Sequence, residues 1–161
     1  MPSYRVSVSA NDLLERVRSH FIGSASPNAS QVLWAEQDAE LLIRPASLAL
    51  RLTQGWLLAT VGVETAETGA STVYIPFFLG RGGSGSGLHA SAGLDGSTNP
   101  IIAARWGEAL HAAVWNGVLD VLEAAVALAR DTTGQPSLTL AGYTAGEGVV
   151  QVLLVSPPKG S

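Results

Sequence analysis

The longest apolar segment of the chain limits its fold more than any other feature. It extends from Asn99 to Arg130 and has clear signals at both ends. Asn99 is a favoured helix N-cap, and Pro100 is a favoured first helical residue because its missing N–H would have no partner there. Gly134 is a typical residue for the position that follows a helix. These signals predict one long helix over about residues 99–131.

The polar side chains of this helix gather on one side. At about 100° per residue they occupy an arc about 120° wide, which leaves about 240° for apolar and small residues. A helix packed on one sheet needs an apolar stripe only somewhat over 100° wide. One sheet face therefore cannot cover the helix, and a second surface has to do so. The residues of the polar arc are Arg105, Glu108, Asn116, Asp120, Glu123 and Arg130.

Three structures would supply the second surface. The sheet could curl around the helix, a short helix near residues 11–22 could cover it, or a second subunit could do so across a two-fold axis. Gly107 and Gly117 favour close approach of another backbone, because each helical glycine costs about 1 kcal/mol relative to alanine. Contact with a second chain would involve the apolar flank. The residues predicted for that interface are Trp106, Gly107, Leu110, Val114, Gly117 and Val121.

The rest of the chain has strand and turn patterns. Apolar and polar residues alternate from Tyr4 to Ser9, which is typical of a half-buried strand, and the short helix follows over about residues 11–22. The later connections are short and suit antiparallel pairing. Pro76 lies inside a predicted strand, which places that strand at an edge or at a bulge. The later predicted strands cover residues 32–36, 41–44, 48–53, 56–63, 71–79, 137–142 and 149–155.

These elements predict a single α+β domain over residues 1–161. Its order is β-α-β-β-β-β-β-α-β-β, with an antiparallel sheet of about six to eight strands against one long and one short helix. A Gly/Ser-rich loop at residues 80–98 separates the predicted strands from the long helix.

The charge content favours a lasting apolar contact. Charged residues make up 14% of the chain, whereas a globular domain usually carries about 25%. We therefore expect a homo-oligomer, a protein partner or a small apolar ligand. The net charge of −4 and the scattered arginines disfavour nucleic acid. Asp120 and Glu123 disfavour a membrane span by the long helix, because one central Asp costs about 2.5–3.5 kcal/mol on insertion.

The location of the protein is predicted from its N-terminus and its cysteine content. Residues 1–6 lack the basic and apolar regions of a signal peptide. The chain has no cysteine, which excludes disulfides, thiolate metal sites and cysteine nucleophiles. We therefore expect a cytoplasmic, bacterial protein.

The Gly/Ser-rich loop contains a formal nucleotide motif without its structural context. Residues 80–85 match G-x-G-x-x-G, but no helix follows directly, as a dinucleotide site requires. Successive glycine amides can still form an anion-binding nest, and the alternative is a solvent-exposed connection. The candidate ligand or anion residues are Arg81, Gly82, Gly83, Ser84, Gly85 and His89.

No set of residues in the sequence defines a reaction. Glu108 and His111 have the E-x-x-H spacing of di-iron bundles, but those sites need two such motifs. Ser84, His89 and Asp95 lie close in sequence on a Gly-rich loop, which is a poor scaffold for a catalytic triad. We therefore predict no catalytic residue, no metal and no cofactor.

The leading functional hypothesis is a non-enzymatic assembly or protein-interaction module that self-associates or docks through the apolar flank of its long helix. One alternative is a protein that binds a small apolar ligand, with its sheet curled round the helix. The other is an enzyme with a site at the Gly-rich loop.

Overall fold

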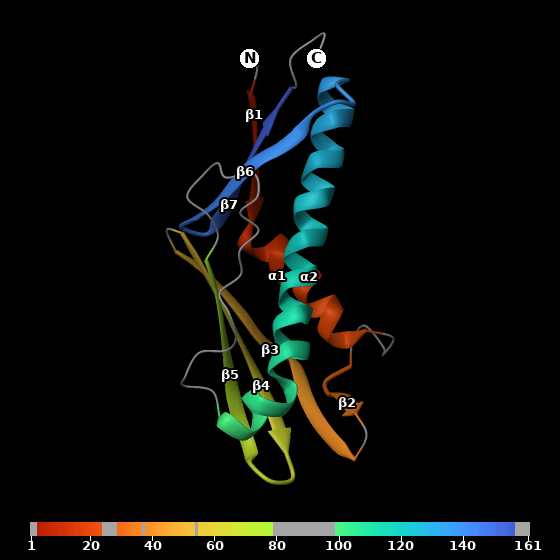
Figure 1. The fold of residues 1–161 in the computed structure, drawn as a ribbon, viewed down its shortest axis with the longest axis vertical. Coiled ribbons are helices and arrows are strands. Elements are labelled where there is room, and N and C mark those ends of the chain that lie inside the picture. Colours follow the sequence, from red (N-terminus) through yellow and green to blue (C-terminus); the bar gives the residue numbers. More distant parts are fainter. Residues whose placement is uncertain (1–2, 24–28, 37, 54, 79–98, 157–161) are drawn as a thin grey trace.

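Two antiparallel sheets lie one after the other along a single long helix (Figure 1). The computed structural model describes residues 3–23, 29–36, 38–53, 55–78 and 99–156. The elements are β1 (Ser3–Ser9), α1 (Ala10–Ile22), β2 (Val32–Glu36), β3 (Ala39–Thr53), β4 (Trp56–Thr65), β5 (Gly69–Phe78), α2 (Pro100–Thr133), β6 (Thr139–Gly146) and β7 (Val149–Val155).

The strands form one sheet in the order β1-β7-β6 and another in the order β2-β3-β4-β5, and every pairing is antiparallel. The predicted α+β class, with one long and one short helix, is confirmed. The arrangement differs from the prediction in two ways, because there are two sheets in place of one, and residues 41–44 and 48–53 belong to one strand.

A bulge in β3 explains why two predicted strands are one. The register against β4 shifts between Arg44 and Ala49. Within the bulge, the Ser47 hydroxyl donates to the Arg44 carbonyl at 2.6 Å and accepts from the Gly62 amide at 2.7 Å. The Ser47 side chain thus links β3 to β4 where the register shifts, and β3 continues beyond it.

The long helix α2 runs along both sheets (Figure 1). Its 34 residues give a helix about 50 Å long at 1.5 Å per residue. The ten residues of β4 extend about 33 Å, and the seven residues of β7 extend about 23 Å. The 15 residues of β3, however, extend about 50 Å, as far as the helix itself. The sheets are joined by a hydrogen bond from the Gly55 amide to the Ala145 carbonyl at 2.8 Å.

The predicted ends of the long helix are confirmed. The Asn99 side chain accepts from the Ile101 amide at 2.9 Å. At the other end Gly134 has φ 67°, in the left-handed region, and its amide donates to the Arg130 carbonyl. Local sequence signals therefore set both ends of α2.

The first helix supplies the second cover of α2. The two helices cross at Gly117, where an added Cβ would lie 2.7 Å from the Val17 Cα. No real Cβ tolerates that distance, so Gly117 permits the crossing. Leu13, Val17 and Phe21 of α1 are all buried. Of the three structures that the sequence left open, the structure contains the one in which the short helix covers the second flank.

The polar arc of α2 faces outward as predicted. All its residues are exposed except Asp120, which is half-buried. The carboxylate of Asp120 lies 2.6 Å from the His20 Nε2 of α1, so this pair links the two helices beside their crossing.

Candidate functional site

The predicted interface residues of α2 are covered by the chain itself. All six are buried, from Leu110 and Val114 at 0% exposure to Val121 at 7%. The prediction that this flank meets a second chain remains a prediction. Such a contact would have to use neighbouring residues that are exposed.

Exposed large apolar side chains identify that neighbouring surface. In the described part of the chain these are Leu33, Trp56, Ile101 and Leu128. Leu128 is the most exposed of them, at 61%. Its angular position places it on the apolar side of α2, so it is the one large residue of that side that the chain leaves uncovered.

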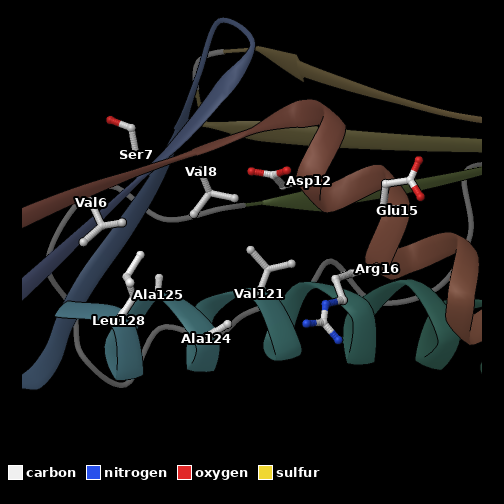
Figure 2. Close-up of a pocket in the computed structure, with 10 residues that line it drawn as sticks. All are labelled: Val6, Ser7, Val8, Asp12, Glu15, Arg16, Val121, Ala124, Ala125 and Leu128. Atoms are coloured by element: carbon white, nitrogen blue, oxygen red, sulfur yellow. The ribbon is translucent and has the colours of Figure 1, made fainter. Parts of the chain in front are cut away.

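Leu128 lies beside an apolar groove between β1 and the C-terminal part of α2 (Figure 2). Val6 and Val8 point from β1 towards the helix, and Leu128 points back towards the strand. The groove has a volume of about 350 Å³. Its apolar lining consists of Val6, Val8, Val121, Ala124, Ala125 and Leu128.

Acidic and basic side chains of α1 lie at the border of the groove. Asp12, Glu15 and Arg16 come from the first turns of α1. Glu15 forms an ion pair with Arg18 at 3.2 Å. Within the described residues, the side chains of Asp12 and Arg16 make no ion pair. The groove is therefore an apolar surface with one unpaired acid and one unpaired base at its border.

A second groove flanks α2 on the side of β6. Leu119, Leu122 and Val126 line it from the helix and Leu140 from the strand, and its volume is about 420 Å³. Arg130 also lines this groove, and its Nε donates to the Leu138 carbonyl at 2.9 Å. The C-terminal part of α2 thus has an apolar depression on each side.

Of the E-x-x-H residues Glu108 and His111, the histidine packs against an aromatic ring. The half-buried His111 ring stacks on Phe77, with 4.7 Å between the ring centroids, whereas Glu108 is exposed. Over residues 3–23, 29–36, 38–53, 55–78 and 99–156 no group of three or more His, Cys, Asp or Glu side chains could hold a metal ion.

The sequence does not predict the His20–Asp120 pair. The two residues are 100 positions apart, and neither forms part of a local motif. Only the crossing of α1 and α2 brings them together.

The predicted loop residues Arg81, Gly82, Gly83, Ser84, Gly85 and His89 lie outside the described residues. Their proposed role in binding a ligand or an anion remains a prediction.

Among the described residues, α2 is the one helix that is long and apolar enough to cross a membrane. In its most apolar window, 44% of the residues are buried inside the protein. The core helix of a globular protein meets the same criteria, so this finding is weak support for a span.

Comparison of the chain with protein-family models, with curated proteins and with solved structures gives no match.

Proposed function

We propose that the chain is a non-enzymatic assembly module that self-associates through the groove beside the C-terminal part of α2. The observation that carries the proposal is Leu128, an apolar side chain exposed at 61% beside a groove lined by Val6 and Val121. Burial of a leucine contributes about 1.5–3 kcal/mol, so covering this residue favours association.

A second copy of the chain is the occupant that fits this surface. A two-fold interface brings the same patch of both subunits together, so the patch has to complement itself. Here a projecting side chain, Leu128, stands beside a hollow, and each copy can insert its leucine into the groove of the other. Asp12 and Arg16 give the border both charges, so contact between two copies can pair opposite charges.

The composition supports the same proposal. Only 14% of the residues are charged, and a protein with this composition has few charged side chains with which to cover a free surface. Two grooves on either side of one exposed helix segment concentrate apolar surface in a single region of the molecule.

Sedimentation equilibrium with a matched pair of variants tests the proposal. We expect the wild-type protein to have twice the chain mass of 16.6 kDa at high concentration. Leu128→Asp places a charge in the apolar contact and should raise the dissociation constant at least about tenfold. Ile101→Asp is the control, because Ile101 lies on the same helix, is also exposed, at 51%, and is remote from the groove.

A wild-type mass of 16.6 kDa at every concentration would contradict the proposal, and so would equal effects of the two variants. A monomer that carries a bound apolar molecule in native mass spectrometry would favour the ligand-binding alternative.

A further inference from the structure

We infer that the free edge of β1 pairs in antiparallel fashion with β1 of a second copy, which joins the two β1-β7-β6 sheets into one continuous sheet. The inference rests on the proposed self-association and specifies its geometry. It comes from the four sheet edges, the placement of the groove and the sequence of β1.

Three of the four sheet edges carry features that discourage strand addition. β2 has only five residues, and β5 contains Pro76, which cannot donate a backbone hydrogen bond. β6 has an irregularity between Leu140 and Gly142, and its Ala145 carbonyl already accepts from the Gly55 amide. Short strands, prolines and bulges are the usual means by which proteins protect an edge.

The edge of β1 lacks these features. Its seven residues pair with β7 from Ser3 to Ser9 without a shift in register. The strand contains no proline, and Arg5 is its single charged residue. In the described part of the chain, β7 is the one strand that pairs with β1. A regular, nearly uncharged edge of this kind is a template for another strand.

The groove lies at this same edge. Val6 and Val8 face α2, whereas Ser7 points to the other side of the strand (Figure 2). A two-fold axis perpendicular to the sheet relates the two β1 strands in antiparallel pairing. The face of one sheet that carries α2 then continues into the face of the other sheet that carries α2. Both copies of α2 would then lie on one face of the joined sheet. In each copy α2 packs against β1 and β7. The β1 strand and the α2 helix of the second copy would therefore lie next to the groove of the first copy and cover Leu128.

The charge of Arg5 limits the register. An axis through Arg5 would place two like charges directly opposite each other, which is unfavourable. An axis through Val6 places Arg5 opposite Ser7 of the other copy, and an axis through Ser7 places it opposite Ser9. We propose that the axis passes through Val6 or Ser7, near the middle of the strand.

Single-cysteine variants test this geometry, because the natural chain contains no cysteine. A residue on the axis has its Cα about 4.5–5.5 Å from the same atom in the other copy, which suits a disulfide. A residue one step from the axis is about 8 Å away, too far for an unstrained disulfide. Val6→Cys and Ser7→Cys are therefore compared under oxidation by diamide, which accepts the two electrons and two protons that the thiols release.

The control is Thr72→Cys, since Thr72 is exposed on the β5 edge. We expect Val6→Cys or Ser7→Cys to form a disulfide-linked dimer at least about tenfold faster than Thr72→Cys. Ser7 is exposed, so Ser7→Cys should fold even if Val6→Cys does not.

The outcomes distinguish this inference from the proposed function. If sedimentation shows a dimer that depends on Leu128 but both β1 cysteines react no faster than the control, pairing through β1 is excluded and self-association through the groove stands. If the protein sediments as a monomer, both proposals are excluded.

Discussion

The middle of α2 and its C-terminal part have the same apolar character but differ in how completely the chain covers them. At Gly117 the helix is covered by α1. The Val17 backbone of α1 approaches Gly117 so closely that no side chain fits between the two residues. At Leu128 the apolar side faces an open groove next to the free edge of β1. An apolar pattern thus predicts a need for cover, whereas the tertiary arrangement determines how much of that cover the chain itself provides.

Truncating one leucine in the middle of α2 and one in its C-terminal part should give the largest difference in the free energy of unfolding. Leu110 is fully buried, so Leu110→Ala should lower the free energy of unfolding by about 2–5 kcal/mol through lost burial and a residual cavity. Leu128→Ala should change the stability of the monomer by about 0.5 kcal/mol or less, because the side chain is largely exposed. Urea denaturation at low protein concentration measures both. Equal losses would show that Leu128 is covered within the chain.

Gly117→Ala tests the close contact between α1 and α2 at their crossing. The added methyl group would meet the Val17 backbone, and overpacking of this kind costs about 1–3 kcal/mol. The clash should outweigh the gain in helix propensity, which is about 1 kcal/mol. Asn116→Ala, at the exposed neighbouring position, is the control and should not destabilise the protein in thermal unfolding. A stabilising effect of Gly117→Ala would mean that the helices can separate there without cost.

The polar link beside the crossing should contribute least. The His20 and Asp120 side chains are 31% and 42% exposed, and partly exposed polar pairs contribute about 0–1 kcal/mol. We expect Asp120→Asn to lower the free energy of unfolding within this range. Glu123→Gln, on the same exposed face, should have no effect. A loss of several kcal/mol on Asp120→Asn would show that this pair, rather than the packing of Val17 on Gly117, holds α1 in place.

Local signals in the sequence predicted the elements well. Asn99 and Gly134 act within one turn of the helix, and Pro76 does lie in an edge strand. The angular pattern of α2 also predicted its exposed arc. These features depend on neighbours in sequence, so the sequence alone contains them.

The remaining features depend on contacts between distant segments. The division into two sheets follows from which distant strands pair with each other, and the His20–Asp120 pair follows from the helix crossing. Leu128 lies at an apolar angle of the helix, yet it is exposed because the sheet ends at β1. A helical pattern gives the side on which a residue lies, but it contains no information on where the neighbouring sheet stops.

We propose that a second copy completes the open side of α2 at the β1 edge. Hydrogen–deuterium exchange of the β1 amides, measured from low to high protein concentration, tests it most directly. Pairing would give the outward-facing amides new hydrogen-bond partners, so exchange within Ser3–Ser9 should slow at least about tenfold as the dimer forms, while exchange in β5 stays constant. Exchange of the β1 amides that is the same at every concentration would contradict pairing through β1.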